Sequence, residues 1–260
     1  MAPLLFLFIL FCSVLQSTPV SADGNRSYAS PISKALCDEM IRHRTLMESN
    51  PVGCQRLSLV KFSYFGFDGQ THDDGEIVVM DAVADHIAKI FDALLARHFP
   101  LQKAQLLNRY DGDDEASMSD NNSSAFNDRP ISGGSSLSMH AYGLAVDVNP
   151  VQNPFVQHAG RTLHVSPKQG EGFLDRTTIR PGMTEDIVDI FADNGFPIWG
   201  GDWHNPTDYQ HFQTSRELAE RLARASSSNA KMIFEGQVEQ YHRCRQAGRS
   251  RRACTAGART

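Results

Sequence analysis

Residues 138–150, with the sequence SMHAYGLAVDVNP, place a histidine and an aspartate seven residues apart around a short apolar stretch. A fully extended chain would hold the backbones of His140 and Asp147 more than ~20 Å apart. The two side chains can share one ligand only if the segment folds back, and Gly143 is the residue that permits such a bend. After the bend, residues 144–148 are predicted to form a strand that carries Ala145 and Asp147 on the same side.

A second pair of such side chains, Asp208 and His211, lies in the segment GGDWHNPTDYQHFQ. With His140 and Asp147 it offers two histidines and one carboxylate as ligands, plus one further carboxylate. Three protein ligands and a position left for water are typical of catalytic zinc sites, and a carboxylate beside a ligand can act as the base. The sequence contains no H-E-x-x-H, which excludes the zinc arrangement carried on one helix. Three neighbouring histidines are interpreted as ordinary structural residues: His158, His164 and His204.

The N-terminus differs in character from the rest of the chain. Residues 4–15, LLFLFILFCSVL, form an apolar run too short to span a membrane, and small residues follow as far as Ala22. This pattern predicts a signal peptide over residues 1–22, and therefore a secreted or periplasmic protein. A lipoprotein anchor at Cys12 is disfavoured because the apolar run continues past that cysteine. The net charge of −5 gives no reason to expect a nucleic-acid partner.

Removal of the signal peptide leaves four cysteines, an even number that suggests disulfides in an exported chain. Local pairing is preferred, Cys37 with Cys54 and Cys244 with Cys254, because each pair closes a short loop. A zinc site built from all four cysteines is the alternative, but their spacing lacks the usual C-x2-C pattern.

Hydrophobic periodicity and turn signals predict both strands and helices in the central part of the chain. Strands are expected over residues 55–69 and 75–80, and helices over 81–98, 182–195 and 215–225. Thr184 is expected to cap the second helix and Gly195 to end it. Residues 110–136 are expected to form a long loop. Its acidic cluster lacks the glycine and closing glutamate of an EF-hand, which favours a solvated turn over calcium.

Four regions are predicted along the chain. The signal peptide is followed by an extension over residues 23–54, of which residues 23–35 are expected to be flexible, and by the main domain over residues 55–225. Residues 226–260 form a C-terminal tail whose end is rich in arginine. A disulfide there would present a compact basic loop able to bind anionic polymers of the cell envelope. The alternative is a disordered tail without a partner.

Two motifs together resemble a known family. The run S-x-H-x-x-G-x-A-x-D, which begins at Ser138, is similar to the signature of zinc D-alanyl-D-alanine carboxypeptidases and L-alanyl-D-glutamate endopeptidases of peptidoglycan, which share a fold with the zinc domain of hedgehog proteins. The segment GGDW…D-x-x-H-F, residues 200–212, resembles the second half of their site. The similarity extends from about Leu57 to Phe212. It implies an α+β domain with helices packed against a small antiparallel sheet.

The resemblance also implies roles for individual residues. The zinc ligands are His140, Asp147 and His211, and the general base is Asp208. An arginine that steadies the substrate carbonyl or carboxylate corresponds to Arg129. Two residues are expected to lie beside the substrate: Ser138 and Trp203.

The function implied is that of a secreted zinc metallopeptidase that cleaves the stem peptides of peptidoglycan with a zinc-activated water. Carboxypeptidases of the family tend to have a glutamate base and Trp-His, whereas this chain has Asp208 and Gln210-His211. This difference favours cleavage between L-alanine and D-glutamate; D-alanyl-D-alanine carboxypeptidase activity is the alternative. A non-hydrolytic zinc-binding module is a third possibility, which the carboxylate of Asp208 argues against because binding alone needs no base.

Overall fold

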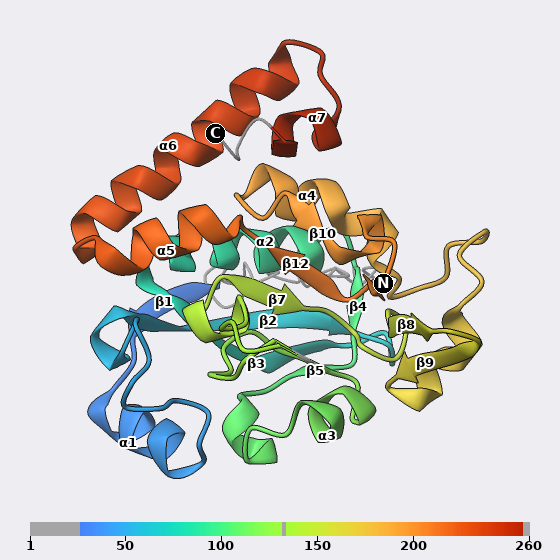
Figure 1. Ribbon diagram of the computed structural model, residues 1–260, viewed down its shortest axis with the longest axis horizontal. Helices are drawn as coiled ribbons and strands as arrows, with labels where there is room; N and C mark the ends of the chain where they lie inside the picture. Colours follow the sequence, from blue (N-terminus) through green and yellow to red (C-terminus); the bar gives the residue numbers. More distant parts are fainter. Residues whose placement is uncertain (1–26, 132–133, 257–260) are drawn as a thin grey trace, which may run out of the picture.

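A computed structural model describes residues 27–131 and 134–256 of the chain. The expected signal peptide lies outside these ranges, and export from the cell therefore stays a prediction. Within the described ranges, no helix combines the length and the apolar character that crossing a bilayer requires. Helices and small, mainly antiparallel sheets alternate along this part of the chain (Figure 1), which confirms the predicted α+β class.

The largest sheet is built on a long antiparallel hairpin. Strands β2 and β3 form the hairpin, while β1 and β4 pair with different parts of the other edge of β2. The expected strands are confirmed, although β3 begins earlier than predicted because its polar first residues still pair with β2. The bounds are β1 (Tyr28–Pro31), β2 (Leu57–Gly66), β3 (Thr71–Met80) and β4 (Pro100–Leu101).

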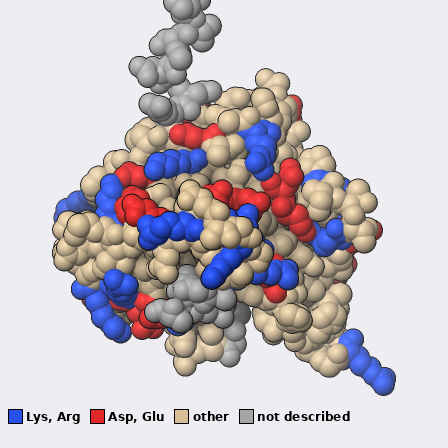
Figure 2. All heavy atoms as spheres, turned by 90° about the horizontal axis from the view of Figure 1, so that it is seen from above, with Lys and Arg blue, Asp and Glu red and all other residues tan. Residues whose placement is uncertain are grey.

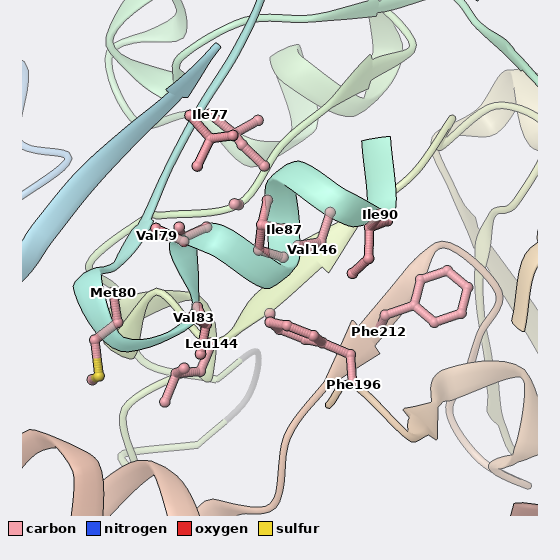
Figure 3. Close-up of a cluster of buried hydrophobic side chains, with 14 of the residues drawn as sticks. Ile77, Val79, Met80, Val83, Ile87, Ile90, Leu144, Val146, Phe196 and Phe212 are labelled. Atoms are coloured by element: carbon pink, nitrogen blue, oxygen red, sulfur yellow. The ribbon is translucent and has the colours of Figure 1, made fainter. Parts of the chain in front are cut away.

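Helix α2 (Ala84–Ala96) lies at the centre of the hydrophobic core and confirms the helix expected in this region. On one side, its Phe91 stacks on Phe62 of β2 with ring centroids 3.6 Å apart. Figure 3 shows another part of the same core, to which α2 contributes Ile87 and Ile90 and the smaller sheet contributes Val146 and Phe212. The helix therefore joins the large sheet to the smaller one that carries the predicted zinc ligands.

Three smaller sheets complete the domain. The first has the strand order β10–β12–β7 and the second β11–β8–β9, both antiparallel, and β5 pairs with β6 in parallel. The predicted strand over residues 144–148 is confirmed as β7. The bounds are β5 (Lys103–Ala104), β6 (Asn122–Ser123), β7 (Ala145–Asp147), β8 (Phe155–Ala159), β9 (Thr162–Ser166), β10 (Ile198–Trp199), β11 (Thr207–Asp208) and β12 (His211–Gln213).

The expected loop over residues 110–136 is partly wrong, because it contains helix α3 (Asp114–Ser119) and strand β6. The acidic cluster explains the helix. The carboxylate of Asp113 accepts a hydrogen bond from the backbone N–H of Ala116, which caps the first turn.

The helix expected over residues 182–195 is divided into a 3-10 turn (Thr184–Ile187) and helix α4 (Val188–Asp193). The capping role predicted for Thr184 is wrong, since its hydroxyl donates instead to the carbonyl of Tyr209. The predicted end is confirmed, as Gly195 adopts a φ of 89°.

Both ends of the described chain belong to the folded domain. The flexibility expected before residue 36 is wrong for residues 28–31, because β1 pairs with β2 along its whole length. Helix α1 (Lys34–Arg42) follows, and the disulfide Cys37–Cys54 ties it to the start of β2. The second disulfide, Cys244–Cys254, also forms as predicted, so a site made of four cysteine thiolates is excluded.

At the C-terminal end, α5 (Arg216–Arg224) confirms the last predicted helix, and the longer α6 (Ser227–Gln246) and short α7 (Arg251–Ala256) follow it. Because α6 buries Phe234 and Val238 against the domain, a disordered tail is wrong for residues 227–256. Figure 2 shows acidic side chains among the basic ones on the face seen from above. Two arginines of the tail pair with Asp202. Binding to anionic polymers stays a prediction.

Candidate metal centre

The two predicted ligand segments meet because their strands are neighbours. Strands β7 and β12 pair antiparallel with His211 directly opposite Asp147. Side chains at opposite positions of an antiparallel pair lie about 5 Å apart on the same face of the sheet. On the other edge of β7, Ser124 exchanges two backbone hydrogen bonds with Asp147, N···O 2.9 and 2.8 Å. The aspartate is thus fixed from both sides.

The bend predicted at Gly143 brings the second histidine to the same place. His140 lies in a 3-10 turn, and Gly143 then adopts a left-handed φ of 66° before β7 begins. A side chain at this glycine would place its Cβ 2.5 Å from the backbone nitrogen of Met80, which itself donates to the carbonyl of Gly143. Both the backbone conformation and the close approach therefore require glycine. The chain therefore folds back at Gly143, as it must if His140 and Asp147 are to share one ligand.

Three side chains converge on one point. His140 Nε2 lies 3.2 Å from Asp147 Oδ2 and 3.2 Å from His211 Nδ1, while His211 Nδ1 lies 2.9 Å from Asp147 Oδ1. All three residues are at least nine-tenths buried. Within the described ranges they form a group whose ligand atoms all lie within 4.8 Å of one another, and they could hold a metal ion.

The hydrogen bonds of the outer ring nitrogens explain why a cation fits here. His140 Nδ1 faces the carbonyl of Ala125, and His211 Nε2 lies 2.7 Å from Gln213 Oε1. The amide of Gln213 is oriented, because its Nε2 donates to the carbonyl of Thr214. Each neutral imidazole therefore carries its proton on the outer nitrogen and points a lone pair inward. When both imidazoles are neutral, two lone pairs and a carboxylate meet without a hydrogen between them and form a set of donors for a metal ion.

Replacement of Gln213 by leucine is expected to weaken zinc binding by roughly 10–100-fold, the usual cost of losing a partner that orients a ligand. The change removes the oxygen that holds His211 in one tautomer. Gln213→Glu keeps an acceptor at the same place and is the matched control, which should retain zinc much better. Competition with a chromophoric chelator measures both affinities. Equal affinities for the leucine and glutamate variants would show that this hydrogen bond has no effect on the metal.

Asp208, the predicted base, lies on β11 beside the cluster. Gly200 packs against it so closely that an added Cβ would lie 2.3 Å from the carbonyl oxygen of Asp208. Among the described residues, the buried Oδ1 atom of Asp208 has no hydrogen-bond partner. Burial, and next the negative charge of Asp147, raise the pKa of Asp208 to about 6.

The ionisation of the cluster itself follows from its contacts. Burial opposes ionisation of Asp147, but the charges and hydrogen bonds of His140 and His211 hold the pKa of its carboxyl far below the usual value. Burial likewise opposes protonation of His211, yet the hydrogen bond and charge of Asp147 raise the pKa of His211 above the usual value. A bound cation would replace the imidazolium charge as the partner of this carboxylate.

The other predicted site residues, Trp203, Ser138 and Arg129, are not members of the metal cluster. The ring of Trp203 lies 5.4 Å from that of His211, centroid to centroid, so it borders the cluster. The hydroxyl of Ser138 accepts a hydrogen bond from the backbone N–H of His140. Arg129 forms an ion pair with Asp114 of α3. The three histidines interpreted as structural are exposed and are not in the cluster: His158, His164 and His204.

Comparison with known proteins agrees with this site. The profile of a family described as D-alanyl-D-alanine carboxypeptidase matches residues 132–214, a range that contains the whole cluster and Asp208. Searches of curated proteins and of solved structures found no match. The family match and the His-Asp-His cluster support a zinc peptidase, and they support the predicted Zn²⁺ cofactor.

Sequence reasoning missed two residues that contact the predicted site residues. Gln213 could have been found from its position, because residues two apart on a strand share a face and Gln213 follows His211 by two. Asp114 had no such signal. Its carboxylate binds both Arg129 and the amide of Asn127, but it belongs to an acidic run in which each carboxylate is equally plausible as a solvated residue.

Proposed function

We propose that the protein is a secreted zinc metallopeptidase that hydrolyses the stem peptides of peptidoglycan. The observation that carries the proposal is the convergence of two imidazole lone pairs and the Asp147 carboxylate, beside a second carboxyl with a free oxygen. The family match supports peptidoglycan peptides as the class of substrate. Two disulfides fit an oxidising compartment, as expected for a protein that acts outside the cytosol.

In this proposal His140, Asp147 and His211 would hold Zn²⁺, which would supply a Lewis acid for the scissile carbonyl and a water molecule whose pKa is lowered toward ~7. Asp208 accepts the proton of the attacking water through its free Oδ1 and delivers it to the leaving amine. The amide of Gln213 keeps His211 in the tautomer that presents Nδ1 to the site.

The remaining residues bind substrate in this proposal. Arg129 neutralises charge on the substrate carbonyl or carboxylate, and Asp114 holds its guanidinium in one orientation until the substrate arrives. The indole of Trp203 forms an apolar wall next to His211. Ser138, whose hydroxyl braces the turn that carries His140, is proposed to lie beside the bound substrate.

The bond between L-alanine and D-glutamate is the proposed site of cleavage. Its support is the nature of the base, since an aspartate reaches less far than a glutamate and so seats the attacked carbonyl differently. Arg129 does not discriminate, because both candidate substrates present a carboxylate. The family description favours the second candidate, removal of the terminal D-alanine.

Digestion of defined muropeptides separates the two activities. We expect zinc-loaded mature protein to release a peptide with a new D-glutamate N-terminus from stems that end in either D-Ala or D-Ala-D-Ala. Mass spectrometry of the fragments identifies the bond. Loss of terminal D-alanine alone, with the L-Ala–D-Glu bond intact, would establish the carboxypeptidase instead. Zinc binding without any hydrolysis would favour the non-hydrolytic module.

A further inference from the structure

The C-terminal segment of the described chain contacts Pro197 and Asp202, which lie just before Trp203. Helix α6 runs along the outside of the domain and rises away from it, and α7 turns back toward α4 and β10 (Figure 1). The disulfide Cys244–Cys254 closes this turn, and Cys254 is 4% exposed. We call residues 244–255 the C-terminal clamp.

The C-terminal clamp binds the carboxylate of Asp202, the last residue of the 3-10 turn (Gly200–Asp202) between β10 and β11. Arg251 Nη2 lies 2.6 Å from Asp202 Oδ2, and Arg252 Nη2 lies 2.6 Å from Asp202 Oδ1. The side chains of Arg251 and Asp202 are 15% and 17% exposed, whereas that of Arg252 is 74% exposed. Because water screens exposed pairs, the contact with Arg251 contributes most to holding Asp202.

The clamp also holds the other end of the same stretch. The carbonyl of Pro197, which precedes β10, accepts hydrogen bonds from Arg251 Nη1 at 3.1 Å and from Thr255 Oγ1 at 3.3 Å. Residues 197–202 are thus fixed at both ends by one disulfide-closed segment. A disulfide limits the freedom of such a loop and keeps its arginine in place.

This stretch touches the groups that act at the site. Gly200 packs on the backbone and Cβ of Asp208, and Trp199 lies opposite Phe212 on the strand that carries His211. The backbone N–H of Trp203 donates to the carbonyl of Gly200, which sets the indole beside His211. A shift of residues 200–202 would therefore move the base and the indole together.

We propose that the C-terminal clamp positions Asp208 and Trp203 beside the metal cluster, with Asp202 as the point of contact and Arg251 as the positioning residue. The expected effect on catalysis rests on the proposed function, whereas the effect of the clamp on the position of Asp208 and Trp203 does not depend on it. A displacement of about 1 Å can reduce a rate by up to ~100-fold, so the ion pair controls turnover without touching substrate.

The test compares Arg251→Gln with Arg243→Gln in the full mature protein. Arg243 lies on α6, is 67% exposed and pairs with Glu239, so its replacement removes the same charge away from Asp202. In zinc-free protein, Arg251→Gln should speed hydrogen–deuterium exchange over residues 198–211 at least ~5-fold, because local opening becomes easier. With zinc bound, kcat on stem peptides should fall about 10-fold and KM should rise, because the base and the indole move together, while zinc content stays unchanged.

Three further variants link the effect to the contact between Arg251 and Asp202. Asp202→Asn should reproduce the loss of kcat, and the double variant with Arg251→Gln should be no slower than either single one. Replacement of both Cys244 and Cys254 by serine should give the same exchange pattern. The proposal is overturned if exchange over residues 198–211 is the same in Arg251→Gln and Arg243→Gln. If Arg251→Gln speeds hydrogen–deuterium exchange but the zinc-loaded wild-type protein hydrolyses no stem peptide, the clamp is supported and the peptidase is rejected.

Discussion

Asp208→Asn is expected to keep its zinc and lose at least ~100-fold in turnover, since the amide has the shape of the carboxylate but cannot accept a proton. The three proposed ligands are untouched by the change, and their outer nitrogens keep the acceptors at Ala125 and Gln213. Metal content by atomic absorption and kcat on a muropeptide, measured on the same preparation, test both halves of the expectation.

The control for this result is Asp175→Asn, which changes an exposed carboxylate that accepts hydrogen bonds from the backbone N–H and the hydroxyl of Thr177. It should leave zinc and turnover unchanged. Near-normal turnover in zinc-loaded Asp208→Asn would remove Asp208 from the mechanism. Loss of the metal together with turnover would show that Asp208 supports the ligands rather than acting as the base.

The core of the site could be predicted from the sequence because its geometry is largely local. His140 and Asp147 lie on either side of one bend, and only Gly143 in that segment tolerates the left-handed φ. Placing His211 in the same site required its β-strand to pair with β7, which spacing alone does not specify. The resemblance supplied that link, and the register His211↔Asp147 gives its physical form.

The supporting contacts could not be predicted, since they join residues whose local patterns are unremarkable. Arg251 belongs to a basic run typical of a solvated surface, yet its guanidinium reaches Asp202, 49 residues earlier in the chain. Residues 23–35 are polar enough to suggest a flexible extension, and only the free edge of β2 makes residues 28–31 a strand. In both cases contacts between distant parts of the chain, rather than the local sequence pattern, determine the structure.

Replacement of His140 or His211 by alanine is expected to remove most of the zinc from the protein. Each change deletes one of three converging donors, and the two that remain cannot complete the coordination of a buried ion. Wild-type protein should bind about one zinc per chain, since three donors and water complete a single tetrahedral site. Isothermal titration of metal-free protein measures the stoichiometry and the affinity.

His204→Ala is the matched control for the two ligand variants, because His204 lies in the same segment as His211 but is exposed and outside the cluster. It should bind zinc as the wild type does. The three variants together separate a specific site from general histidine affinity, since each loses one imidazole and only two lose a donor that points inward. Equal zinc content in His140→Ala, His211→Ala and His204→Ala would refute the metal centre, and with it the part assigned to Asp208.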